Sequence, residues 1–265
     1  MSSPTDVYAD LKTEGEVLDK LVASLDTAQW DLPTPAPGWT IKHQVAHLSS
    51  TARLAGISAS DPAMFAKVTV GADKDFDGAV NALLTPYLSA SPADLLARWR
   101  SEREVAVKAL SALPPAQMVP WVARDIPASA LACAGLMELF AHGQDIYDTI
   151  GAPREYTDAI GHLTWFGTRN RDFAYLVRGL TPPEAEFRYE FTAPSGTVWA
   201  FGPEDAENRI TGPAVDFCML VTRRRNRADL AVTATGADAD QWLDIAQAYR
   251  GSPGPGREPG QFASK

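Results

Sequence analysis

The sequence predicts a mostly α-helical protein, with a helical bundle over residues 1–180 and a small α+β domain with an antiparallel sheet over residues 181–250. Two observations favour this division. Apolar residues recur three and four positions apart through most of the first part, which is the period of an amphipathic helix. Beyond residue 183, apolar and polar residues alternate, which is typical of strands. Residues 251–265 are rich in Gly and Pro, and we expect them to form a disordered tail.

Four long helices are expected in the bundle. Each has an apolar stripe, and some have clear boundary signals, such as Ser91 before Pro92 at the start of the third and Gly151 at the end of the fourth. The expected bounds are residues 6–30, 40–58, 91–113 and 127–150, followed by a further helix over 157–178. The segment 61–86 has weak periodicity and is expected to hold at most a short helix over 79–84. It is interpreted either as an irregular wall of a pocket or as an ordinary connecting loop.

The α+β domain is expected to follow the order strand, strand, strand, helix, strand, helix. Residues 187–191 alternate between aromatic and charged side chains, and Ser195-Gly196 marks a turn to the next strand. The expected bounds are strands 187–191, 197–201, 208–211 and 231–235, and helices 214–222 and 241–249. This order favours a small antiparallel sheet with helices on one face.

The composition excludes several classes of protein. A net charge of −9 argues against nucleic acid as the main partner. The two cysteines, Cys133 and Cys218, lie in separate apolar segments, so we expect buried small side chains and no disulfide framework. The longest apolar run, residues 126–141, contains Glu138 and is too short to cross a bilayer. The first residues lead directly into an amphipathic helix and predict no signal peptide, so we expect a soluble, cytoplasmic protein.

The pattern Glu138-x-x-x-His142-x-x-Asp145 closes the most apolar helix of the chain. Residues three or four apart lie on one face of a helix, so these three side chains form one polar stripe. An unpaired carboxylate in such a place costs several kcal/mol or becomes protonated. A bound cation is one partner that would avoid this cost, and a buried hydrogen-bonded Glu–His pair is the alternative.

A second polar cluster begins the helix expected at residue 40, where Thr40 is a candidate N-cap. His43 and His47 are four residues apart and share a face of this helix. Together with Glu138 and His142 they offer the ligands of a site with two histidines and one carboxylate. Three protein ligands and an open position are typical of catalytic rather than structural zinc.

These motifs resemble a known family. The segment Pro37-Gly38-Trp39-Thr40-Ile41 with Ala46-His47-Leu48, followed by the Glu138 motif, is similar to the DinB-like superfamily and, more narrowly, to the actinobacterial mycothiol-dependent maleylpyruvate isomerases. The resemblance implies an up-and-down four-helix bundle that carries a divalent metal, followed by a smaller α+β domain. It implies His47, Glu138 and His142 as metal ligands and the thiol mycothiol as cosubstrate. His43 departs from the family, which often has an acidic residue there, so it is a candidate fourth ligand, outer contact, substrate contact or general base.

Two further polar residues have alternative interpretations. Asp145 is expected either to orient His142 by accepting its free N–H or to pair elsewhere. In the run Arg223-Arg224-Arg225, the family pattern puts Arg224 at a position where it could clamp a substrate carboxylate. The run could instead neutralise the carboxyl end of a helix. His162, which has only Asp158 as an acidic neighbour at helical spacing, is interpreted as a packing or surface histidine.

The expected function is a divalent-metal-dependent isomerase or S-transferase that uses mycothiol on a small electrophilic, carboxylate-bearing substrate. Zinc is the first expectation for the metal, with nickel, iron and manganese as alternatives. Three alternatives stay open: a hydrolase that uses a metal-bound water, a non-haem iron oxygenase, and a non-catalytic small-molecule or metal-binding protein. The expected partners are a substrate and a thiol, with no nucleic acid and no membrane. The oligomeric state, including a homodimer, is open.

Overall fold

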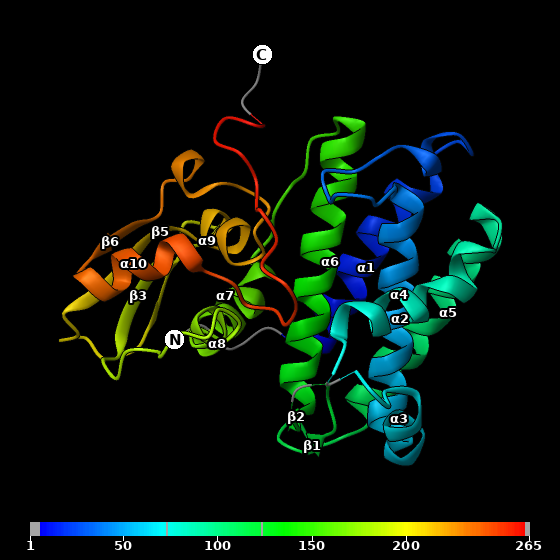
Figure 1. Cartoon of the computed structure of the whole chain (residues 1–265), viewed down its shortest axis with the longest axis horizontal. Coiled ribbons are helices and arrows are strands. Elements are labelled where there is room, and N and C mark those ends of the chain that lie inside the picture. The colour runs from blue at the N-terminus through cyan, green and yellow to red at the C-terminus, as the bar shows by residue number, and fades with distance from the viewer. Residues whose placement is uncertain (1–5, 73, 123, 263–265) are drawn as a thin grey trace. The chain divides into compact units, whose positions relative to one another are not determined.

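The structure is a computed structural model that describes residues 6–72, 74–122 and 124–262. The chain divides into two compact units, Met1–Arg154 and Glu155–Lys265 (Figure 1). The first unit is helical and the second contains a sheet with helices, which confirms the predicted fold class. No helix among the described residues is long and apolar enough to cross a membrane.

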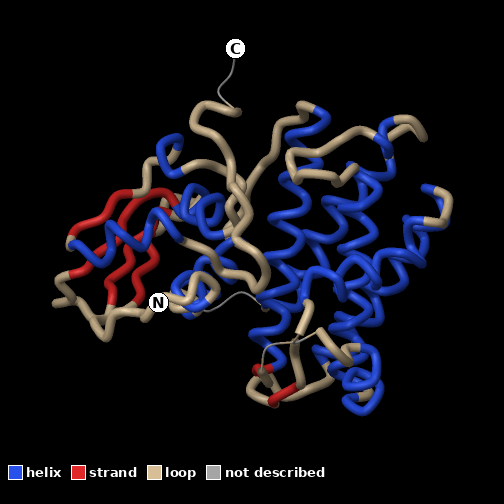
Figure 2. The backbone as a smooth tube through the Cα atoms, in the orientation of Figure 1, coloured by secondary structure: helices blue, strands red, loops and turns tan. Residues whose placement is uncertain are grey.

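The first unit is a bundle of four long helices with short elements between them (Figure 2). The long helices are α1 Val7–Ala23, α2 Ile41–Ser60, α5 Pro92–Ser111 and α6 Ala128–Ile150. The short elements are η1 Gln29–Asp31, α3 Pro62–Val68, α4 Phe76–Leu88, β1 Met118–Val119 and β2 Ile126–Pro127. Helix α2 packs against α5 and α6, and α1 packs against the same two helices. The four predicted long helices are therefore present, but the first ends at Ala23 rather than near residue 30, and residues 29–31 form the separate turn η1.

Helix α6 positions most of the candidate site, and its sequence explains how. Small residues in its first turns let neighbouring helices approach closely: an added Cβ on Gly135 would lie 3.1 Å from Leu11 of α1. The helix ends at Gly151, which has φ +66° and so adopts the left-handed conformation that glycine tolerates best. The fully buried Ile146 anchors the last turns in the apolar core.

The segment 61–86 is more helical than predicted. Asp61 caps α3 by accepting from Met64 N, and Asp75 caps α4 by accepting from Gly78 N. Helix α4 then buries Leu84 and Tyr87 in the bundle core. The predicted short helix over 79–84 was wrong in length, because caps and tertiary packing stabilise a helix whose own periodicity is weak.

The second unit begins earlier than predicted, before α7 rather than at residue 181. Its elements are α7 Ile160–Arg169, α8 Phe173–Leu176, β3 Phe187–Thr192, β4 Val198–Phe201, β5 Asn208–Pro213, α9 Ala214–Val221, η2 Arg227–Asp229, β6 Thr233–Thr235 and α10 Ala237–Ile245. Helix α7 belongs here because it packs on α9, where Thr164 Oγ1 lies 3.5 Å from Cys218 Sγ. The expected single helix over 157–178 breaks near Asn170, whose side chain donates to Phe166 O.

The sheet of the second unit is mixed, with strand order β4-β3-β5-β6. The strands β3 and β5 are parallel, which corrects the prediction of a purely antiparallel sheet. The path of the chain after the hairpin explains the difference. Strand β4 runs antiparallel to β3 and ends near the start of β3. The chain then crosses to the other side of β3 and begins β5 at that same end, so that Phe187 lies opposite Asn208. Gly202 makes the crossing, with φ +80° and no room for a Cβ beside Phe187 O.

The C-terminal part also differs from the prediction. The last helix covers Ala237–Ile245 rather than 241–249, and it begins directly after the glycine that ends β6. Residues 251–262 form no helix or strand, but Asn226 Nδ2 donates to Arg257 O and Gly260 N donates to Asp229. These hydrogen bonds connect residues 257–260 to the segment 226–229, and the disordered tail stays a prediction. Residues 263–265 lie outside the described part of the chain.

Candidate metal site

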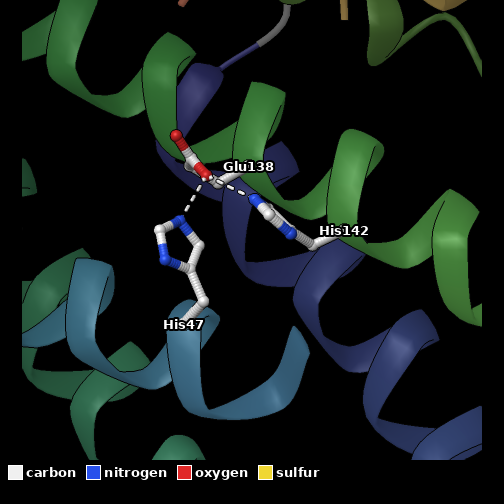
Figure 3. Close-up of side chains that lie close together, drawn as sticks. All are labelled: His47, Glu138 and His142. Carbon is white, nitrogen blue, oxygen red and sulfur yellow. Dashed lines mark hydrogen bonds and ion pairs between the residues drawn. The ribbon is translucent and has the colours of Figure 1, made fainter. Parts of the chain in front are cut away.

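Helices α2 and α6 bring three predicted ligands together (Figure 3). His47 Nε2 and His142 Nε2 each lie 3.1 Å from the same carboxylate oxygen, Oε2 of Glu138. One potential ligand atom from each residue lies within 4.8 Å of the other two. Glu138 and His142 are one helical turn apart on α6, and His47 faces them from α2. The sequence therefore predicted correctly that these three side chains converge.

A buried amide, Gln44, orients His142. Its Oε1 lies 2.5 Å from His142 Nδ1, and its Nε2 donates to Thr34 Oγ1 and to Asp145 Oδ2 at 2.9 and 3.3 Å. Gln44 and Asp145 are both completely buried. Of the two alternatives for Asp145, orienting His142 is possible through Gln44, because Asp145 accepts from the amide whose oxygen contacts the imidazole. Gln44 was missed in the sequence, although it lies three residues before His47.

This arrangement fixes the proton on His142. A carboxylate oxygen only accepts hydrogen bonds, so the Gln44 amide nitrogen faces Asp145 and its oxygen faces the imidazole. The amide oxygen also only accepts, so Nδ1 of His142 carries the proton. In the neutral imidazole, Nε2 then presents a lone pair to Glu138, which is a second acceptor. Two acceptors 3.1 Å apart need a shared positive charge, either a second proton or a metal ion. The donor set therefore fits a divalent cation.

The carboxylate at the centre of the cluster stays ionised. Burial by itself would raise the pKa of Glu138. In the first alternative, where Nε2 of the histidines carries a proton, hydrogen bonds from His142 and His47 lower this pKa well below its usual range. The side chains remain partly accessible, with an exposed fraction of 24% for Glu138 and 13% for each histidine. The cluster thus keeps one side open toward solvent, as a site that receives a further ligand must.

Trp39 packs against the histidine rings. Its ring is stacked on His142 at a centroid distance of 5.7 Å and lies 5.4 Å from the His47 ring. It follows Gly38, which has φ +78°, in the loop that leads into α2. His47 has no equivalent of Gln44: its Nδ1 is buried and has no hydrogen-bond partner in the described part of the chain. Trp39 therefore provides a packing surface for the side of the cluster that hydrogen bonds do not fix.

His43 is used at the start of α2 and is not one of the three clustered ligands. Thr40 N donates to His43 Nδ1 at 3.2 Å in a capping box, in which the residue at the third helical position satisfies the N-cap amide. Burial, and then the charge of Lys42, lower the pKa of His43, so its neutral form predominates at pH 7. Its catalytic role stays a prediction.

The sequence also singled out Arg224, for which a substrate contact was one alternative, and His162, Cys133 and Cys218, for which no reactive role was predicted. Arg224 follows α9 in the second unit, where its Nη1 donates to Thr222 O at 2.6 Å. His162 is in α7 of the same unit. Cys133 and Cys218 are both buried with free thiols, as predicted, and burial raises the pKa of the Cys133 thiol to about 12. Cys133 is therefore protonated at neutral pH.

Comparison with known proteins agrees with the geometry. The family described as mycothiol maleylpyruvate isomerase N-terminal domain matches residues 11–147, just over half of the chain, and the family described as wyosine base formation matches residues 183–235. Uncharacterized proteins from two strains of Mycobacterium tuberculosis are 44% identical over 257 residues, which cover 97% of this chain and 100% of theirs.

Two solved structures share the fold. They are a mycothiol-dependent maleylpyruvate isomerase and a histidine-to-alanine mutant of that enzyme, with TM-scores of 0.56 and 0.58 at 15% identity. Each comparison covers 86% of this chain and 91% of the other. The predicted family is confirmed, and the chain belongs to the mycothiol maleylpyruvate isomerase family.

Proposed function

We propose that the chain is a metal-dependent enzyme that uses mycothiol either to isomerise a small electrophilic substrate or, as an S-transferase, to displace a leaving group from it. The observation that carries the proposal is the shared contact of His47 and His142 with one oxygen of Glu138. Membership of a family described by mycothiol and maleylpyruvate supports the thiol and the reaction type. Zinc is the proposed ion, since two histidines and one carboxylate with an open position are typical of catalytic zinc.

The ion would supply acidity to a bound thiol. A thiol with an ordinary pKa near 8.5 is only a few per cent ionised at neutral pH, and lowering its pKa below 7 requires roughly 2 kcal/mol of differential stabilisation. A coordinated thiol is deprotonated. The chain's own part is to hold three ligand atoms in place: Gln44 fixes the His142 tautomer, and the ionised Glu138 contributes negative charge.

Two further residues have proposed roles in the reaction. His43 is the proposed general base, because it lies one helical turn from His47 and its imidazole is neutral at pH 7. Since Nδ1 accepts from Thr40 N, Nε2 carries the proton of the neutral ring, and a base function requires Nδ1 to release this cap contact and take up the proton. Arg224 is the proposed partner of a substrate carboxylate, because guanidinium groups bind carboxylates with two parallel hydrogen bonds. The alternatives are hydrolysis through a metal-bound water and ligand binding without turnover.

The first test is the metal content of the purified protein. We expect about one divalent ion per chain in the wild type and less than one tenth of that in His47→Ala, because removal of one of three ligands leaves an incomplete site. His162→Ala, which removes a histidine from the second unit, is the matched control and should keep the wild-type content. Elemental analysis measures the ion. Equal metal content in His47→Ala and wild type would disprove the metal site.

The second test separates catalysis from helix capping at His43. His43→Gln keeps a residue suited to the third position of a capping box but removes the imidazole. We expect an unchanged melting temperature, unchanged metal content and a 10²–10⁴-fold lower rate of thiol-dependent isomerisation of maleylpyruvate. The rate is measured with mycothiol and, separately, with glutathione. A wild-type rate in His43→Gln would leave His43 with a structural role only.

A further inference from the structure

The second unit contains a pocket that none of the roles above uses. It lies between the turn after α9, helix α10 and the C-terminal segment, and has a volume of about 200 Å³. Its polar lining is dominated by arginine and includes Arg223, Arg225, Asn226, Arg227, Asp244 and Arg257. The chain as a whole has a net charge of −9, so this local concentration of positive charge is unusual for it. It therefore needs an explanation of its own.

The acidic groups near the pocket are already engaged. Arg227 binds Asp244 through Nη1 at 2.7 Å and binds Asp240 through Nη2. Burial, and then the positive charge of Arg223, lower the pKa of the neighbouring Arg178, as expected where cations are crowded. Four arginines and one carboxylate therefore line the pocket, and Arg227 binds that carboxylate, Asp244.

The backbone at Arg223 is strained in a way that favours glycine. Arg223 N donates to Leu220 O and Arg224 N donates to Met219 O, which together form the Schellman motif that ends α9. Arg223 has φ +58° and is the only non-glycine residue with positive φ in the described ranges. Glycine usually occupies this position, because a side chain is disfavoured there. An arginine at such a position indicates that its side chain has a use, since strained conformations concentrate at functional sites.

Neutralisation of the helix end explains only part of this cluster. Arg224 and Arg225 each donate to a backbone carbonyl in the turn, at 2.6 and 2.7 Å, as helix-capping cations do. Arg223 makes only a 3.5 Å contact, from Nη2 to Gly254 O, and its Nε is buried with no hydrogen-bond partner among the described residues. The C-terminal segment approaches its guanidinium closely, since a Cβ on Gly256 would lie 2.8 Å from Nη2. The capping role therefore leaves Arg223 unexplained.

We propose that this pocket binds a small anion that carries a phosphate or carboxylate group, with Arg223 and Arg257 as its main charged contacts. Guanidinium groups bind both kinds of anion with paired, charge-assisted hydrogen bonds. The volume is below the 300–1,000 Å³ or so that is common for pockets of drug-sized ligands, so the ligand is small. All lining residues belong to the second unit, and the proposal does not depend on the metal site.

The test measures anion binding to the full chain at constant ionic strength, because salt screens weak electrostatic contacts. Inorganic phosphate and succinate are the probes, titrated calorimetrically and by thermal shift. We expect saturable binding of at least one of them and a rise in melting temperature. The tighter probe identifies the class of anion.

Three variants test the residues. Arg223→Gly should weaken binding at least tenfold while the melting temperature without ligand stays the same or rises, because glycine relieves the backbone strain. Arg257→Gln should weaken binding without that rise. Arg169→Gln removes an exposed arginine elsewhere in the same unit and should bind like the wild type. The proposal is overturned if neither anion binds saturably, or if Arg223→Gly and Arg257→Gln both bind as tightly as Arg169→Gln.

Discussion

Replacing Glu138 with Gln is expected to remove the metal and the thiol chemistry together while leaving the fold in place. Both histidines contact one oxygen of this carboxylate, so the substitution removes the negative charge on which the site converges. The ion content should fall below one tenth of the wild-type value, and the thiol-dependent rate should fall at least 100-fold. A ligand at 100 times its dissociation constant stabilises a protein by about 2.7 kcal/mol, and this gain on addition of zinc should disappear.

The stability of the metal-free protein distinguishes this result from simple unfolding. The lowered pKa of Glu138 means that the folded state stabilises its ionised form at neutral pH, so we expect Glu138→Gln to lower the free energy of unfolding without metal. The variant should still unfold in one cooperative transition, which shows that the fold is retained. Glu104→Gln makes the same chemical change at an exposed position on α5 and should keep both metal and rate. If Glu138→Gln retains the wild-type metal content and rate, the proposed function is wrong.

The long helices of the bundle and the pairing of Glu138 with His142 could be predicted because they depend on local rules. Helical spacing puts Glu138 and His142 on one face whatever the helix packs against. Caps such as Ser91 and stops such as Gly151 act within a few residues, so the helix bounds could be predicted from them. The prediction that His47 joins them from α2 rested on the family resemblance, because spacing along the chain does not show which two helices pack together.

The errors lie where distant contacts decide the structure. Helix α4 forms because Leu84 and Tyr87 enter a core built by other helices. The parallel pairing of β3 and β5 depends on a crossover that begins at Gly202. The alternation of apolar and polar residues predicts a strand but not the direction of its neighbour. Gln44 was missed for the same reason, since its partner Asp145 lies 101 residues away. A buried amide in an apolar helix face is the signal that would have identified it.

Gln44→Leu is expected to weaken metal binding without touching a ligand. The amide oxygen that holds His142 Nδ1 is lost, so the imidazole is free to rotate and to change tautomer. Loss of such an outer partner typically lowers metal affinity 10–100-fold. The completely buried Asp145 also loses the Gln44 donor, which should cost about 1–3 kcal/mol in the free energy of unfolding.

Gln144→Leu is the matched control, because it removes a second buried amide from the same bundle. The Gln144 donor goes to Asp148 at 2.8 Å, one turn further along α6, and its Oε1 accepts from Arg154 at 3.2 Å. We expect a loss of stability in this variant with unchanged zinc affinity, both measured by competition with a chelator and by denaturant titration. If the two variants bind zinc equally, Gln44 fills space and Asp145 has no part in orienting His142. If only Gln44→Leu loses affinity, the buried chain from Asp145 through Gln44 controls the imidazole, because loss of packing alone would affect both variants alike.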